Sequence, residues 1–307
     1  MPEMEPNVPP PRRVTPLREM PAVPRDGLRF PLSRDQLVAR VKEALEEDGA
    51  FNDVTTIATV RSERRARAAL VARQGGTIAG IPFALETFRM LDPKISMRVD
   101  KEDGKRAMKG EIVLYISGHA RGMLSAERVA LNFLMRLSGV ATLTSRYVDA
   151  VRGTGVKILD TRKTTPGWRS LEKYAVRAGG GTNHRMDLAS SVLIKDNHLA
   201  AVDGNVEIAI RRARELSHGA RIEIECITAD QVAAAAAAGA NVILLDNMPL
   251  DLMRECVKVT ARRCELEASG GVTLDTVRAI AETGVDMISV GALTHSAAAL
   301  NLALDFE

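Results

Sequence analysis

The sequence has few aromatic residues, which make up 3% of its 307 positions, and it has no long apolar run. Because a helix needs roughly 18 or more consecutive apolar residues to cross a bilayer, we expect no membrane-spanning segment. The N-terminus also lacks the apolar core of a secretory signal peptide, so we expect a protein that is not secreted. With so few aromatic rings, alanine and the branched aliphatic residues must fill the core.

Cysteine and net charge are also low. The three cysteines, Cys226, Cys256 and Cys264, form no close-spaced pair of metal ligands, and one thiol would remain if two were joined. This usage fits a reducing cytoplasm. A net charge of +3, from 42 basic and 39 acidic residues, provides no broad basic field for nucleic acid, so any anion site must be local.

Several common catalytic motifs are missing. The sequence has no nucleophile elbow, no Walker lysine loop and no dinucleotide fingerprint. Hydrolase, nucleoside triphosphatase and nicotinamide-dependent oxidoreductase functions therefore lose their usual support.

Residues 1–31 hold nine of the thirteen prolines, together with several arginines and acids. Proline blocks helix and sheet hydrogen bonding, so this stretch is predicted to be a disordered, proline-rich tail. The first ordered element is predicted at Ser33, which can cap a helix together with Gln36 three residues later. Apolar residues then follow at helical spacing until Gly49 ends the helix.

Residues 32–140 have the pattern of a small α+β domain. Short β-rich segments at 68–71, 95–99 and 112–116 are separated by glycine-containing turns, and a helix is expected near 83–91. Ser125 is predicted to cap a further helix that connects this domain to the rest of the chain.

From about residue 156, apolar runs alternate with helical stretches. The runs lie at 156–159, 192–194, 222–224, 242–245, 266–268 and 287–290, and the helical stretches at 206–216, 229–238, 250–262 and 274–282. This alternation predicts a parallel sheet, and six or more such units favour an α/β barrel, here within residues 141–293. A doubly wound open sheet is the alternative.

Charged residues follow several of these predicted strands. They include the basic residues Arg162, Lys163 and Lys195 and the acidic residues Asp160, Glu225 and Asp246. A loop over 174–187, with three consecutive glycines before His184 and Arg185, would bring two further bases to the same face. Clustered like charges repel unless an anion neutralises them, and the arginine fork suits carboxylate or phosphate. A di- or polyanion is therefore the predicted ligand.

The last two predicted strands end in short turns of small residues, at 268–272 and 289–292. Barrel enzymes often bind a phosphate in these turns through main-chain N–H groups, so a phosphate site is predicted. Glu225 and Asp246, on neighbouring strand ends, suit Mg²⁺ or ribose hydroxyls.

Five segments, taken in order, resemble the quinolinate phosphoribosyltransferase family. They are 160–167 (DTRKTTPG), 171–176 (LEKYAV), 179–181 (GGG), 183–185 (NHR) and 194–198 (IKDNH), and the similarity extends from about residue 37 to the C-terminus. The resemblance implies an N-terminal α/β sandwich domain and a C-terminal incomplete α/β barrel of the type II phosphoribosyltransferase kind, with residues 294–307 folding back onto the first domain. It also implies a homodimer in which Arg128 reaches the partner's site.

The resemblance further implies a reaction. Quinolinate and 5-phosphoribosyl 1-diphosphate would combine with Mg²⁺ to give nicotinate mononucleotide, diphosphate and CO₂, a step in NAD synthesis. The acid would lie against Arg128, Arg162, Lys163, His184, Arg185 and Lys195, with Thr161 as a further substrate-binding residue. Glu225 and Asp246 would face the ribose and the metal, while Ser269, Gly270, Gly271, Val290, Gly291 and Ala292 would hold the 5-phosphate. The expected catalytic residues are Lys163, Lys195, Glu225 and Asp246.

Three other functions remain open at this point. A related enzyme on the same scaffold could phosphoribosylate a different acid, and a Schiff-base aldolase could use Lys163 or Lys195. A non-catalytic binding protein is also compatible with an anion cluster, although it leaves the acidic pair and the phosphate turns unexplained. Asp160 is expected to orient its basic neighbours rather than to act in catalysis.

Overall fold

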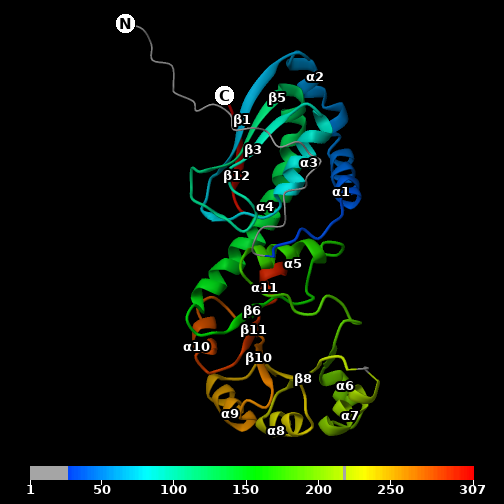
Figure 1. Cartoon of the computed structure of the whole chain (residues 1–307), viewed down its shortest axis with the longest axis vertical. Coiled ribbons are helices and arrows are strands. Elements are labelled where there is room, and N and C mark those ends of the chain that lie inside the picture. Colours follow the sequence, from blue (N-terminus) through cyan, green and yellow to red (C-terminus); the bar gives the residue numbers. More distant parts are fainter. Residues whose placement is uncertain (1–26, 217–218) are drawn as a thin grey trace.

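The computed structural model describes residues 27–216 and 219–307, and Figure 1 shows them as two connected units. Residues 1–26 of the predicted tail lie outside the described residues. Phe30, near the end of that predicted tail, packs its ring edge-on against Phe83 and Tyr174, at centroid distances of 5.7 and 5.3 Å. Ordered packing therefore begins before Ser33, which the proline content did not predict.

The first unit is an antiparallel sheet of order β12-β1-β5-β3 with helices against one face (Figure 1). Its elements are α1 (Arg34–Glu47), η1 (Ala50–Asn52), α2 (Val54–Thr59), β1 (Arg65–Ala72), β2 (Gly76–Thr77), α3 (Ile81–Leu91), β3 (Ser96–Val99), β4 (Arg106–Ala107), β5 (Ile112–His119) and β12 (Leu302–Phe306). The C-terminal β12 pairs with β1, so that Leu304 lies opposite Leu70 and segments from both ends of the chain share one sheet.

One predicted helix cap is confirmed and another is wrong. The Ser33 hydroxyl accepts a hydrogen bond from the N–H of Gln36 at 3.2 Å, and the Gln36 side chain accepts one from the N–H of Ser33 at 2.9 Å. Ser125, in contrast, caps nothing, because β5 runs directly into α4 (Ala120–Ala150) and Ser125 lies inside this helix. Its hydroxyl donates instead to Asp53 Oδ2 at 2.9 Å.

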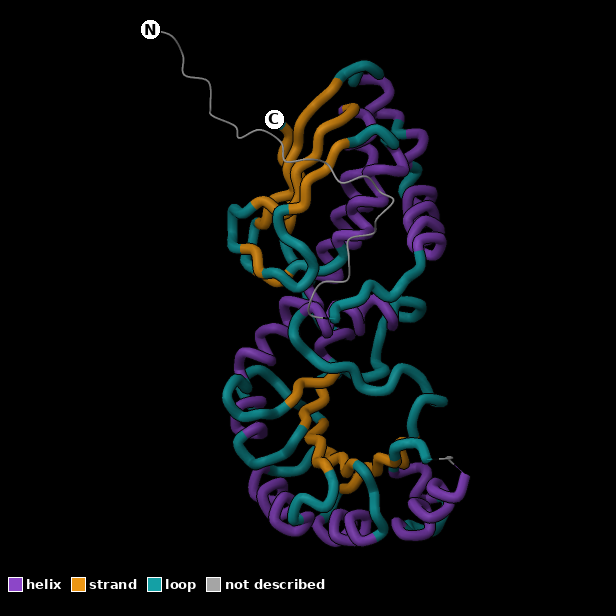
Figure 2. Tube along the Cα trace, in the orientation of Figure 1, coloured by secondary structure: helices purple, strands orange, loops and turns teal. Residues whose placement is uncertain are grey.

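The second unit is a parallel sheet of order β6-β11-β10-β9-β8-β7. Its strands are β6 (Lys157–Leu159), β7 (Val192–Ile194), β8 (Ile222–Cys226), β9 (Val242–Asp246), β10 (Glu265–Ser269) and β11 (Met287–Ser289). Figure 2 shows them as an arc with helices along its outside. The strands follow one another around the arc in chain order, with β11 returning beside β6, so the sheet is a barrel of six strands and not a doubly wound sheet.

The barrel is incomplete because β6 and β7 do not pair. In the described part of the chain, only an isolated parallel bridge between Leu159 and Thr182 extends the sheet beyond β6. The helices of this unit are α5 (Arg169–Ala178), α6 (Asp196–Ala200), α7 (Val206–Leu216), α8 (Ala229–Ala237), α9 (Leu250–Thr260), α10 (Val277–Ala281) and α11 (Ala292–His295). The predicted loop 174–187 is therefore wrong in its first part, because residues 174–178 form the last half of α5.

Helix α4 connects the two units along its 31 residues. Phe133 on this helix stacks between Phe83 of the first unit, at a centroid distance of 4.1 Å, and Trp168 of the second, at 5.5 Å. Three of the few aromatic rings thus lie at the junction, while small and aliphatic side chains fill the two cores. Among the described residues, no helix combines the length and the apolar character that crossing a membrane requires.

Candidate active site

Fourteen of the fifteen predicted site residues line one cavity at the carboxyl ends of the barrel strands. They are Thr161, Arg162, Lys163, His184, Arg185, Lys195, Glu225, Asp246, Ser269, Gly270, Gly271, Val290, Gly291 and Ala292. The cavity holds about 730 Å³, within the range expected for a small-molecule site. Residues far apart in the sequence meet there because parallel strands all end at the same edge of the barrel.

Arg162 and Arg185 form the cationic wall of the cavity. The Nε atoms of both are buried and have no hydrogen-bond partner among the described residues. Burial lowers the pKa of Arg185, and the neighbouring charge of Arg162 lowers it further. Two half-buried guanidinium groups with unused donors, held close enough to repel each other, form a site that an anion would stabilise.

Lys195 and Glu225 form an ion pair across the ends of β7 and β8. Lys195 Nζ lies 2.5 Å from Glu225 Oε2, and the lysine side chain is 47% exposed. On the next strand end, Asp246 accepts a hydrogen bond from the side chain of Asn247 at 3.1 Å. The lysine is thus held by a carboxylate yet remains open to the cavity.

His184 has a contact at each ring nitrogen. Its Nδ1 accepts a hydrogen bond from the N–H of Arg185 at 2.7 Å, and its Nε2 lies 3.0 Å from Glu223 Oε2 and 3.6 Å from Glu267 Oε2. Burial opposes the charged form, but the two carboxylates outweigh it and raise the pKa of His184. Since the imidazolium would lose the bond from Arg185, the present contacts suit the Nε2–H tautomer. The ring is therefore held from inside the barrel and does not reach freely toward a ligand.

The sequence reasoning missed Glu223 and Glu267. Both are buried inside the barrel, and each has one carboxylate oxygen without a hydrogen-bond partner among the described residues. Strand alternation could have suggested Glu223, because it is two residues before Glu225 on β8 and so points to the same face. With His184 they offer three ligand atoms within 4.8 Å of one another, a spacing that could hold a metal ion. Glu223 also provides negative charge near Arg185.

Asp160 is fully buried and organises the segment beneath the cavity. It accepts hydrogen bonds from the ammonium group of Lys173, from the Asn183 side chain at 2.5 Å and from the N–H of His184 at 2.9 Å. Lys173 is also fully buried and was not predicted to matter. Asp160 therefore orients Lys173 and the 183–184 segment, and among the described residues it forms no hydrogen bond or ion pair with Arg162 or Lys163.

The two glycine turns close the other end of the cavity. Gly270 and Gly271 both have positive φ, at 94° and 60°. A Cβ on Gly291 would lie 3.1 Å from His295 Nε2 and 3.3 Å from Lys163 Cδ, so glycine allows Lys163 to approach this turn. The main-chain N–H of Val290 is already donated to Leu159 O, whereas those of Gly270, Gly271 and Gly291 have no protein acceptor in the described structure.

Arg128 is the predicted residue that the cavity does not include. It lies exposed on α4 in the first unit and lines no part of the cavity in its own chain.

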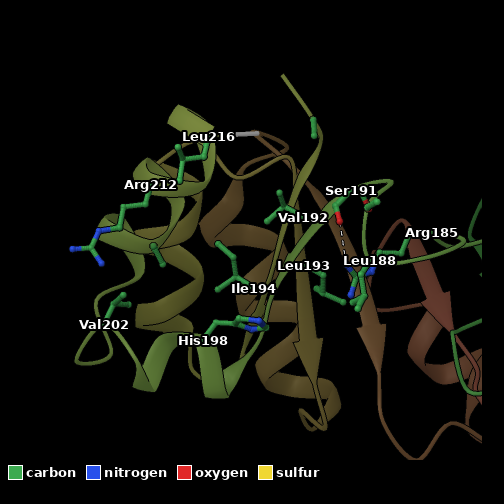
Figure 3. A pocket seen from close by; sticks show the side chains of 13 residues that line it. Arg185, Leu188, Ser191, Val192, Leu193, Ile194, His198, Val202, Arg212 and Leu216 are labelled. Atoms are coloured by element: carbon green, nitrogen blue, oxygen red, sulfur yellow. Dashed lines mark hydrogen bonds between the residues drawn. The ribbon is translucent and has the colours of Figure 1, made fainter. Parts of the chain in front are cut away.

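A second cavity, of about 580 Å³, lies beside β7, α6 and α7 (Figure 3). Figure 3 shows Val192, Ile194 and His198 among the lining side chains, and Arg185 donating a hydrogen bond to Ser191 O at 3.0 Å. Arg185 is its only predicted site residue, and most of its lining is apolar. The predicted site residues therefore gather in the first cavity, which is the candidate site.

Comparisons with known proteins match both units of the chain. The family model "Quinolinate phosphoribosyl transferase, N-terminal domain" matches residues 53–138, and its C-terminal counterpart matches residues 140–305. A probable nicotinate-nucleotide pyrophosphorylase [carboxylating] of Bacillus subtilis is 44% identical over 260 residues, covering 84% of this chain and 89% of its own. A nicotinate-nucleotide pyrophosphorylase [carboxylating] of Mycobacterium leprae is 44% identical, with coverages of 86% and 95%. The crystal structure of NadC from Streptococcus pyogenes is 38% identical and superimposes with a TM-score of 0.85, with coverages of 90% and 99%.

Proposed function

The chain belongs to the quinolinate phosphoribosyl transferase family, and from this premise we propose that it transfers phosphoribosyl from 5-phosphoribosyl 1-diphosphate to quinolinate. Decarboxylation accompanies the transfer, and the products are nicotinate mononucleotide, diphosphate and CO₂. One observation carries the proposal: arginine donors that have no partner among the described residues share a cavity with two carboxylates and two glycine turns. This set matches an aromatic diacid at one end and a phosphorylated ribose at the other.

Quinolinate binds at the cationic end of the cavity. Arg162 and Arg185 donate to its two carboxylates, and Lys195 lies at the edge of this group. His184 supports Arg185 through the hydrogen bond at Nδ1, and Thr161 shapes the start of the loop by accepting from the N–H of Lys163 at 3.1 Å. Arg128 completes the acid site from a second copy of the chain, since its exposed position on α4 leaves it outside its own cavity.

The ribose and its phosphates occupy the other end. The 5-phosphate binds to the free N–H groups of Gly270, Gly271 and Gly291, and Ser269 and Ala292 lie beside them. Val290 lines the cavity but donates no hydrogen bond to the phosphate, because its N–H already donates to Leu159 O. Glu225 and Asp246 lie between the two ends, where they face the ribose.

Glu225 and Asp246 also suit Mg²⁺. Their carboxylate oxygens are hard ligands on neighbouring strand ends and both line the cavity, so the donor set fits this ion. When bound, Mg²⁺ would neutralise charge on the diphosphate.

The reaction follows from the residue types. Loss of diphosphate leaves positive character at C1 of the ribose, which Glu225 and Asp246 stabilise, while Lys163 neutralises the leaving group. The ring nitrogen donates its electron pair to C1. The resulting pyridinium accepts the electrons of the C2–carboxylate bond as CO₂ leaves, and a proton then adds to C2. The protein needs no further cofactor for the decarboxylation.

The direct test is to incubate the protein with quinolinate, 5-phosphoribosyl 1-diphosphate and Mg²⁺ and to measure CO₂ and nicotinate mononucleotide. Nicotinate should react more slowly by a factor of up to about 10⁴, because it leaves buried donors of the acid site unpaired. Comparable turnover of the two acids, or product with a different aromatic acid only, would contradict the proposal. Borohydride trapping of a carbonyl substrate on Lys163 or Lys195 would favour the aldolase alternative instead.

The reaction is proposed to take place in a reducing cytoplasm. All three cysteines are free thiols in the structure, and burial raises the pKa of Cys226 to about 12, which keeps this thiol protonated and unreactive.

A further inference from the structure

A half-buried ion pair links three segments around the cavity without lining it. Arg136 on α4 donates to Glu172 Oε1 on α5 at 2.5 Å, and the Glu172 side chain is fully buried. Burial of a charge pair is costly unless other hydrogen bonds satisfy its remaining atoms. Here those other hydrogen bonds are formed with two segments, one at each end of the proposed substrate site.

Glu172 holds the loop that follows β6. Its Oε2 accepts a hydrogen bond from the N–H of Thr165 at 3.0 Å, and its Oε1 accepts one from the Thr165 hydroxyl at 2.9 Å. This loop carries Arg162 and Lys163, and among the described residues it pairs with no strand. Glu172 is therefore one of the contacts that position the acid-binding end.

Arg136 holds the segment that follows β11. Its guanidinium donates to Thr294 O at 2.6 Å and to Ala297 O at 2.9 Å. Thr294 belongs to α11, which starts directly after the glycine turn of the phosphate-binding end. The Arg136–Glu172 ion pair thus holds the loop after β6 at one end of the cavity and the segment after β11 at the other.

The fully buried Thr294 side chain makes the direct connection between these ends. Its hydroxyl lies 2.7 Å from Lys163 O and 3.2 Å from Gly291 O. A hydroxyl has one hydrogen and can donate it fully to one carbonyl at a time. It therefore has two arrangements: one joins the Lys163 loop to α11, and the other forms a local bond within the turn.

We propose that the Thr294 hydroxyl couples the two ends of the cavity, so that occupancy of the phosphate turn strengthens binding of the acid, and the reverse. A phosphate at the N–H groups of Gly291 and its neighbours holds the turn in the arrangement in which Thr294 donates to Lys163. The acid site is then in place before the acid arrives. Coupling of this kind is reciprocal, and it requires an element with two arrangements that both ligands bias. This inference rests on the proposed function.

The size of the effect follows from one neutral hydrogen bond. Such a bond contributes enough to change a dissociation constant by about three- to tenfold. We therefore expect ribose 5-phosphate to lower the Kd of quinolinate by that factor in the wild-type protein, and quinolinate to lower the Kd of ribose 5-phosphate equally.

The test measures the quinolinate Kd with and without ribose 5-phosphate, by calorimetry and by the fluorescence of Trp168, the single tryptophan, which lies at the start of α5. Thr294→Val and Thr294→Ala remove the hydroxyl, and each variant should still bind quinolinate and ribose 5-phosphate when either is added by itself. The ratio of the quinolinate Kd without ribose 5-phosphate to that with it should, however, fall to about one. Thr294→Ser keeps the donor and should restore the wild-type ratio.

Thr283→Val is the matched control. Thr283 is also buried, and its hydroxyl donates to Ile280 O at 2.7 Å at the end of α10, away from the cavity. The ratio of the two quinolinate Kd values in Thr283→Val should equal the ratio in the wild type. A full wild-type ratio in both Thr294→Val and Thr294→Ala would overturn the coupling. So would independent binding of the two ligands to the wild type, whereas failure of the wild type to bind quinolinate at all would overturn the proposed function as well.

Discussion

At the scale of single residues, the Lys173 ammonium and the Asp160 carboxylate are buried together beneath the cavity. Burial lowers the pKa of Lys173 and raises that of Asp160, so each charge depends on the other. We expect Lys173→Met to reduce the free energy of unfolding by about 3–5 kcal/mol, because it leaves a buried carboxylate without its cation. Urea unfolding measures this loss.

Two variants control for this prediction. Asp160→Asn added to Lys173→Met removes the unpaired charge and should recover part of the stability. Lys42→Met breaks an exposed pair with Glu46 and should change stability by less than about 1 kcal/mol. If Lys173→Met is no more damaging than Lys42→Met, the buried pair does not hold the floor of the cavity.

Glu267 should make stability depend on pH. Burial and the charge of Glu223 raise its pKa from 4.5 to about 7. The folded state thus binds this proton more tightly than the unfolded chain, so the stabilisation is fully present below pH 4.5 and is lost as the pH rises through 7. Glu267→Gln cannot ionise, and relative to the wild type it should gain up to roughly 3 kcal/mol across that range.

The measurement is the free energy of unfolding of both proteins at several pH values from about 4 to about 8. Taking the difference between the two proteins cancels the titrating groups that do not contact Glu267, whereas His184 and Glu223 titrate together with it. A difference that stays constant with pH would show that Glu267 titrates normally.

At the scale of elements, the turn after β10 depends on glycine for more than its backbone angle. A Cβ on Gly270 would lie 2.2 Å from Asn247 Oδ1, and Asn247 donates to Asp246. Gly270→Ala should therefore displace Asp246 and lower kcat/KM for 5-phosphoribosyl 1-diphosphate by about tenfold or more. Steady-state kinetics with this substrate varied checks the prediction.

Gly271→Ala is the matched control for the same turn. Its Cβ would meet nothing closer than Asn247 Oδ1 at 4.0 Å, although its φ of 60° adds some strain. We expect a smaller loss of kcat/KM than for Gly270→Ala. Equal losses would mean that backbone strain, and not the contact with Asn247, controls the turn.

The elements also show which local predictions succeed. The six predicted barrel strands are confirmed, because each is a short apolar run that ends at a polar or glycine residue. Ser125 was predicted wrongly as a helix cap because serine is a residue type that often caps helices. In the structure it lies inside α4, and its hydroxyl contacts Asp53, which is 72 positions earlier in the chain. Residues 174–178 were predicted as loop because the glycines that follow them dominate the pattern.

For the whole molecule, the strongest prediction is that Arg128 acts in a site of a second copy of the chain. If this residue completes a site in a second copy of the chain, Arg128→Ala and Lys195→Ala are each inactive, but a mixture of the two regains activity. A hybrid dimer would contain one site with both residues intact, so about a quarter of wild-type activity per site is expected after random exchange of subunits. Activity that stays absent after subunit exchange has been verified by mass spectrometry would place Arg128 outside any shared site.

The sequence predicted the alternation of strands and helices and most of the residues that line the cavity. These follow from periodicity and motif spacing, which neighbouring positions specify, and from the rule that parallel strands end at one edge. The buried partners of the site residues could be found only from the fold. The role of Lys173 comes from its contact with Asp160, and the roles of Glu223 and Glu267 come from their contacts with His184. Thr294 likewise acts through Lys163, which is 131 positions away in the chain. Such partners depend on how the barrel closes, which no local pattern specifies.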